Sequence, residues 1–85
     1  MESRHLPVVF RWKNFKFFFF SNEGDPREPP HVHVRNGSAR AKFWIGPVSL
    51  AENIGFAAHE LNSLMGVIEK NEVLIERVWH EYFST

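Results

Sequence analysis

The chain has 85 residues, 44% hydrophobic and 15% aromatic, which is enough for one domain with one packed core. It has no Cys, which excludes disulfides and thiolate chemistry, and its longest apolar run, Phe17 to Phe20, is far too short to span a bilayer. The formal net charge is zero, yet residues 1–50 carry eight Lys or Arg against four acids (+4), and residues 51–85 carry two against six (−4). Such asymmetry is typical of an interaction surface. The N-terminus leads into no signal-peptide core, so we expect a cytoplasmic protein.

Two strands, Pro7 to Trp12 and Phe15 to Phe20, are predicted around Lys13-Asn14, because Asn tolerates the left-handed conformation of a tight turn. With a two-residue turn, the predicted cross-strand pairs are Trp12–Phe15, Phe10–Phe17 and Val8–Phe19. These residues share one face, since side chains alternate along a strand. The opposite face then carries Val9, Arg11, Lys16, Phe18 and Phe20.

A polar loop at 21–30 leads to the strongest hairpin signal in the chain. Asn36-Gly37 lies between two alternating segments, 31–35 and 38–45, and Asn-Gly favours a turn with positive φ at both positions. The predicted pairs are Arg35–Ser38, Val34–Ala39, His33–Arg40, Val32–Ala41 and His31–Lys42. One face is apolar, with Val32, Val34, Ala39, Ala41, Phe43 and Ile45, and the other carries His31, His33, Arg35, Arg40, Lys42 and Trp44.

The C-terminal part predicts helices. Apolar residues recur at helical spacing at Leu61, Leu64, Met65 and Ile68, and again at Ile75, Val78, Trp79 and Tyr82. Asn71 between them can cap the second helix, and residues 48–50 are suited to a short additional strand. We therefore predict one α+β domain over residues 1–85, with a four-stranded, mainly antiparallel sheet of two hairpins and two helices packed on its apolar face. Core positions are expected for Trp12, Phe43, Trp79, Tyr82 and Phe83.

Several segments of the chain resemble a known bacterial family. They are Pro-Val-Val-Phe at 7–10, the aromatic strand before Ser21-Asn22, Pro-Pro-His-Val-His-Val at 29–34, Ala-Lys-Phe-Trp at 41–44, Gly-Phe at 55–56 and Trp-His-Glu-Tyr-Phe at 79–83. Over nearly its whole length the chain is similar to the uncharacterised family catalogued as domain of unknown function 4160. One departure is Ala57, where family members often have the Ser of a capping box three residues before Glu60.

The resemblance implies a genetic neighbourhood for the protein but assigns it no activity. Genes of this family often lie beside a second small gene, of the domain of unknown function 2442 type, in pairs suspected of being toxin–antitoxin modules. It thus implies a cytoplasmic protein partner, the product of the neighbouring gene.

The polar face of the 31–45 hairpin is the candidate binding site. It holds His31, His33, Arg35, Arg40, Lys42 and Trp44 without an acid, and Arg11, Lys16, Phe18 and Phe20 join it if the first hairpin extends the same sheet. Basic side chains opposite one another cost stability, and such local conflicts are more frequent at functional sites. A basic face with interleaved aromatics suits phosphate backbones and stacked bases. The alternative is a solvated face whose cations discourage edge-to-edge aggregation.

The two histidines allow further interpretations. A zinc site needs a third protein ligand, and the predicted neighbours Arg40 and Lys42 repel a cation, so neither a metal nor another cofactor is expected. A metal-independent ribonuclease is the alternative enzyme, with His31 and His33 as the base and the acid and Arg40 or Lys42 stabilising the charged transition state. A structural alternative is that His31 and His33 hold the 21–30 loop through hydrogen bonds.

These features predict a binding module rather than an enzyme. We expect a component of a small two-gene, toxin–antitoxin-like system that acts through protein contacts, with nucleic acid as a second type of partner. The sequence leaves a homo-oligomer open and indicates no membrane contact.

Overall fold

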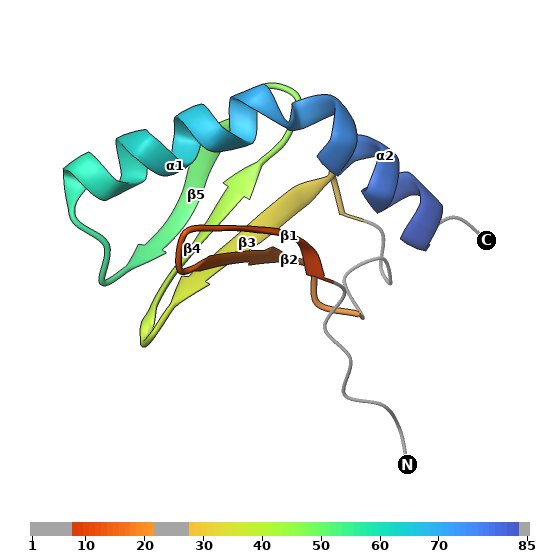
Figure 1. The fold of residues 1–85 in the computed structure, drawn as a ribbon. Coiled ribbons are helices and arrows are strands. Elements are labelled where there is room, and N and C mark those ends of the chain that lie inside the picture. Colours follow the sequence, from red (N-terminus) through yellow and green to blue (C-terminus); the bar gives the residue numbers. More distant parts are fainter. Residues whose placement is uncertain (1–7, 22–27, 84–85) are drawn as a thin grey trace, which may run out of the picture.

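The computed structural model describes residues 8–21 and 28–83. Its elements are β1 (Val8–Trp12), β2 (Phe15–Phe18), β3 (His31–Asn36), β4 (Ala39–Trp44), β5 (Ser49–Ile54), α1 (Ala58–Lys70) and α2 (Glu72–Phe83). The strands form one antiparallel sheet in the order β1-β2-β3-β4-β5. Both helices cross one face of this sheet, and within the described residues no helix covers the other (Figure 1). The predicted α+β fold is thereby confirmed.

The sheet has five strands, so the prediction of four was wrong. The additional strand, β5, pairs with β4 along Ser49–Ile54 and is exposed at every residue except Ala51. Its sequence, SLAENI, has no apolar–polar alternation, and Ala, Glu and Asn are depleted in strands. The strand forms because its backbone N–H and C=O groups pair with those of β4. The pattern of its side chains does not indicate this pairing.

The first hairpin has the predicted two-residue turn. Trp12 pairs with Phe15 and Phe10 with Phe17, as expected. Val8 pairs with Phe18 rather than Phe19, because a β-bulge between Val8 and Phe10 adds a residue to β1. The bulge exchanges the predicted faces of two residues: Val8 is 43% exposed, and Val9 packs against the core.

The residues that adopt a positive φ in the two turns are not all the ones predicted. Among the described residues, Lys13 (φ 53°) is the only residue other than glycine in the left-handed region, so the special position of the first turn is Lys13 and not Asn14. In the second hairpin Gly37 has a φ of 61°, as predicted, but Asn36 belongs to β3. The turn is therefore Gly37-Ser38, which fits type II′, where only the first central residue needs positive φ.

This turn displaces all five predicted pairs of the second hairpin by two residues. Arg35 lies opposite Arg40 instead of Ser38, and His33 lies opposite Lys42 instead of Arg40. A strand repeats every two residues, so a shift of two keeps each side chain on its predicted face. The faces of the hairpin were thus predicted correctly, although the pairs within them were not.

The core lies between the sheet and the helices. Its members are Phe17, Phe19, Val32, Val34, Ala41, Phe43 and Ile45 on the sheet side, and Phe56, Leu64, Ile68, Ile75 and Trp79 on the helix side. Phe43 and Trp79 are buried as predicted, and Trp12 and Phe83 pack at the border of the core. Tyr82 was wrongly expected there: it is 44% exposed, and the next residue, Phe83, turns toward Trp79.

Ala57 occupies the N-cap of α1, as the sequence predicts. Its backbone N–H donates to Glu60 Oε1 at 2.9 Å, which is half of a capping box. The other half needs a side-chain acceptor at the cap, and alanine has none. At the far end, Asn71 serves both helices: its side-chain amide donates to the Val67 carbonyl at 2.8 Å, and its own carbonyl accepts from Ile75 N–H at 2.9 Å.

We expect Ala57→Ser to stabilise the domain by about 0.5–2 kcal/mol, because its hydroxyl completes the capping box that Glu60 already begins. The cap position is exposed, so the new hydroxyl meets no packing obstacle. Urea denaturation of the variant and the parent measures the difference. The matched control is Ala58→Ser, one residue inside α1, which should not stabilise. Equal effects of the two substitutions would show that capping is not the cause.

Candidate functional site: the open face of the sheet

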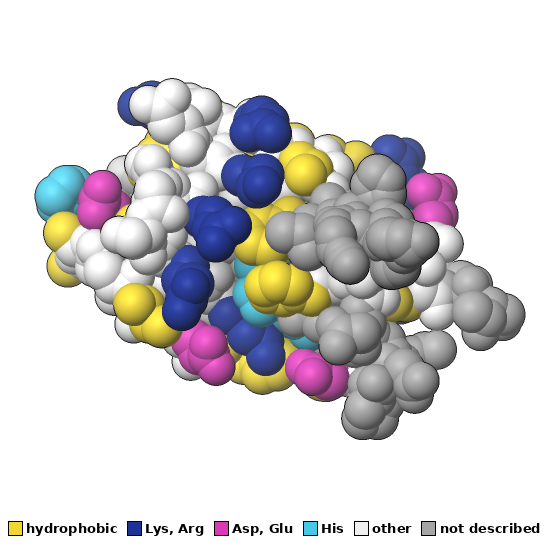
Figure 2. Space-filling model, turned by 90° about the horizontal axis from the view of Figure 1, so that it is seen from below, with side chains coloured by type: hydrophobic (Ala, Val, Ile, Leu, Met, Phe, Trp, Pro, Cys, Tyr) yellow, Lys and Arg dark blue, Asp and Glu magenta, His cyan; other side chains and the backbone are white. Residues whose placement is uncertain are grey.

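Four cations form a row across the sheet face that the helices leave uncovered, which we call the open face. Arg11 of β1 pairs with Lys16 of β2, Lys16 with Arg35 of β3, and Arg35 with Arg40 of β4. We call these four residues the cation row. Figure 2 views the molecule from this side and shows Lys and Arg side chains gathered along it. Neighbouring strands lie about 4.8 Å apart, so the row spans about 14 Å.

The cation row places three like-charge pairs directly opposite one another. Such pairs destabilise a sheet. Within the described residues no member of the row has an ion pair that offsets this repulsion. Arg11, Arg35 and Arg40 are exposed and Lys16 is half-buried, so their charges are available to an anionic ligand.

The row beside it mixes aromatic, basic and acidic side chains. Phe18, His33, Lys42 and Glu52 are successive cross-strand partners from β2 to β5. Lys42 is engaged within the protein, because its Nζ lies 3.5 Å from Glu28 Oε1 and 4.5 Å from the centre of the Trp44 ring. Its value as an anion-binding residue is correspondingly lower than that of the cation row.

The 31–45 hairpin contributes no acid to this face, but two acids reach it from outside the hairpin. Glu52 reaches it on β5, which extends beyond the short additional strand expected at 48–50, and Glu28 reaches it from the loop before β3. No local signal marks either residue, since Glu28 lies in a polar, proline-rich segment and Glu52 in a segment without alternation.

His31, a predicted site residue, is fully buried. Its Nδ1–H donates to the Pro29 carbonyl at 3.0 Å. Its ring lies 4.8 Å from that of Trp79 and 5.5 Å from that of Trp44. These contacts support the structural alternative for His31, in which it fixes the end of the 21–30 loop.

His33 remains on the open face and is half-buried. Its ring stacks on Phe18 at 5.6 Å and meets Phe20 edge-on at 4.6 Å. Phe18 is only 3% exposed, whereas Phe20 is 40% exposed, so Phe20 is the accessible ring of this group. Arg11, Lys16, Phe18 and Phe20 do join the face, because β2 pairs with β3.

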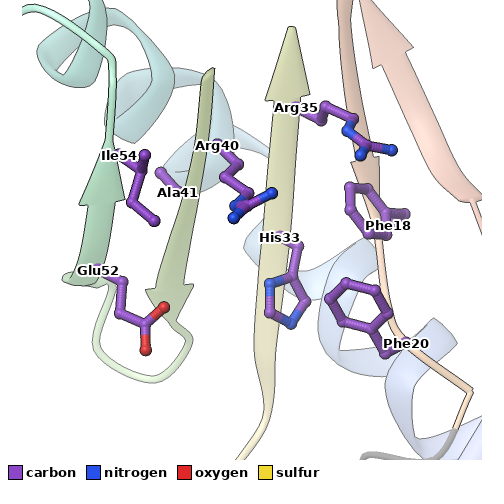
Figure 3. A pocket seen from close by; sticks show the side chains of 8 residues that line it. All are labelled: Phe18, Phe20, His33, Arg35, Arg40, Ala41, Glu52 and Ile54. Atoms are coloured by element: carbon purple, nitrogen blue, oxygen red, sulfur yellow. The ribbon is translucent and has the colours of Figure 1, made fainter. Parts of the chain in front are cut away.

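A hollow of about 170 Å³ lies on this face, between the cation row and the aromatic group. Figure 3 shows side chains of four successive strands around it, from Glu52 and Ile54 on β5 to Phe18 on β2. The part of the chain that the structure describes holds no group of three or more His, Cys, Asp or Glu placed to bind a metal.

These features define a small α+β domain with one sheet face packed on helices and the other open, basic and partly aromatic. The sequence model of one family, described as Domain of unknown function (DUF4160), matches residues 14–80, and the chain belongs to this family. No curated protein and no solved structure matches this chain. None of the described helices is long and apolar enough to cross a membrane.

Proposed function

We propose that this domain is a binding module, not an enzyme, and that it binds single-stranded nucleic acid on the open face of its sheet. The cation row carries the proposal. Its three like-charge pairs destabilise the folded protein when no ligand is bound. An anionic chain laid across them removes this repulsion. Spacing of about 4.8 Å between strands lets several phosphates meet cations at once.

The neighbouring aromatic group favours a single strand over a duplex. Unpaired bases stack on exposed aromatic rings, whereas the bases of a duplex already stack on one another. Phe20, 40% exposed and in contact with His33, offers such a ring beside the cations. An acidic protein would satisfy the charges but would leave this aromatic ring without a specific role.

The two-gene setting implied by the family resemblance remains part of the proposal. The product of the neighbouring gene would be the protein partner, in a toxin–antitoxin-like pair. Co-purification of the two products tests this part separately from nucleic-acid binding.

The ribonuclease alternative gains no support from the position of His31. General acid–base catalysis requires a side chain that reaches the proton it transfers. His31 is fully buried and donates its Nδ1–H to the Pro29 carbonyl, so its ring does not reach a ribose hydroxyl on the open face in this conformation.

Binding to a single-stranded RNA of about 10 nucleotides, within the usual range for small binding folds, tests the proposal. Each phosphate neutralised on a single strand contributes about −0.7 to the slope of log affinity against log salt. Four cations therefore predict a slope of about −2.8, or about a 50-fold loss of affinity between 50 and 200 mM salt. Fluorescence anisotropy of a labelled mixed-sequence RNA measures it. An affinity that does not change with salt concentration, or equally tight binding to the matching duplex, contradicts the proposal.

A further inference from the structure

The hollow on the open face has the size and the lining of a site for one flat ring. Its volume of about 170 Å³ is close to the ~150 Å³ of an engineered cavity that binds benzene. It is smaller than the pockets of about 300–1,000 Å³ that take drug-sized ligands. Aromatic, apolar, cationic and acidic side chains line it together, namely Phe20, His33, Arg35, Arg40, Glu52 and Ile54. A planar polar ligand therefore fits better than an aliphatic one.

Glu52 is the unexpected member of this lining. On a cationic face its carboxylate should pair with the nearest base, and its cross-strand partner is Lys42. Lys42 instead forms its ion pair with Glu28, at 3.5 Å. Within the described residues Glu52 is exposed and has no ion pair. Its carboxylate is thus an acceptor available to a ligand, on a face that also carries the cation row.

Arg40 supplies hydrogen-bond donors from the strand adjacent to that of Glu52. It lies on β4, one row along from Glu52, and is directly opposite Ile54 of the same pocket. Figure 3 shows Arg40 and Glu52 extending from adjacent strands on the same side of the sheet. The ligand that suits both is a ring with N–H donors for the carboxylate and acceptors for the guanidinium.

We infer that this hollow holds one unpaired guanine of a bound single strand, an inference that rests on the proposed function. Guanine has two adjacent N–H donors, N1–H and the N2 amino group, which match the two oxygens of Glu52. It also presents O6 and N7, the acceptors that arginine recognises most often. Adenine, cytosine and uracil lack adjacent donors from two nitrogens on one edge. Phe20, at the border of the hollow, is the ring on which the base or its neighbour stacks.

The test compares RNAs of about 10 nucleotides that differ at one position. The reference is all uridine, and the others carry a single central guanosine, adenosine or cytidine. For the native protein we expect guanosine to tighten binding about tenfold over each of the other three, within the range of one bidentate base contact. Glu52→Gln should lose most of the preference for guanosine, because an amide has only one acceptor and places its own N–H donors opposite those of guanine.

Glu69→Gln is the matched control, since it removes an exposed acid on α1 and should keep the full preference for guanosine. Equal, salt-dependent binding of all four RNAs by the native protein overturns the guanine site and leaves the proposed function standing. A preference of the native protein for cytidine or adenosine also overturns the guanine site. Absence of RNA binding, with or without binding of an acidic peptide such as polyglutamate, removes both the inference and the proposed function.

Discussion

Replacing Arg35 and Arg40 together by glutamate is expected to abolish RNA binding while leaving the fold intact. The two residues are direct cross-strand partners at one end of the cation row and beside the hollow. Their reversal changes the charge of the row from +4 to zero and sets two acids against the phosphates. Like charges brought together at an interface cost several kcal/mol, so affinity should fall by at least about 100-fold. Lys42 is a poorer choice for this test, because its charge is already paired with Glu28.

The fold should survive because the double variant does not increase the number of like-charge pairs directly opposite one another in the cation row. The native row has three like-charge pairs, and the variant has two, since Lys16 then faces a glutamate. Both arginines are exposed, so no buried contact is lost. Circular dichroism and a thermal melt check the fold, and anisotropy at low salt checks binding.

The matched control reverses two exposed cations on the helices, Lys70 and Arg77, which changes the net charge by the same amount. This control should retain most of the affinity. If both double variants weaken binding equally, overall charge and not the cation row attracts the RNA. If neither does, the open face is not the binding surface.

Much of this site could be predicted from the sequence, because the period of a strand is insensitive to an error of two residues. The turn was expected at Asn36-Gly37 and lies at Gly37-Ser38, yet Arg35 and Arg40 still share the open face. The error did, however, give the wrong cross-strand pairs within that face. The predicted register set His33 against Arg40, and the true one sets Arg35 against Arg40, which creates the cation row.

The remaining features depend on contacts that no local pattern encodes. β5 forms along the free edge of β4, and the sequence indicated a strand only at 48–50, so Glu52 and Ile54 could not be assigned to the site. His31 alternates with the other polar-face residues, which predicts exposure. Trp79, which lies far along the chain on α2, contributes to this burial because its ring lies 4.8 Å from that of His31.

Trp79→Ala should be among the most destabilising single substitutions in this domain. Trp79 is 2% exposed and is the largest fully buried side chain. Its ring packs against Phe19 at 5.1 Å, Phe83 at 4.3 Å and His31 at 4.8 Å, so it joins β3, the strand end after β2, and α2. Removal of a buried tryptophan costs about 3–5 kcal/mol, because a cavity replaces these contacts.

That loss is large against the total stability of a domain this small. At roughly 0.05–0.15 kcal/mol per residue, 85 residues give about 4–13 kcal/mol. We therefore expect a fall in the melting temperature of more than about 12 °C, measured by circular dichroism. Val73→Ala, on the same helix at a position 82% exposed, is the control and should change stability by less than about 0.5 kcal/mol. A small effect of Trp79→Ala would mean that α2 does not hold the end of β3, and the buried position of His31 would then lose its explanation.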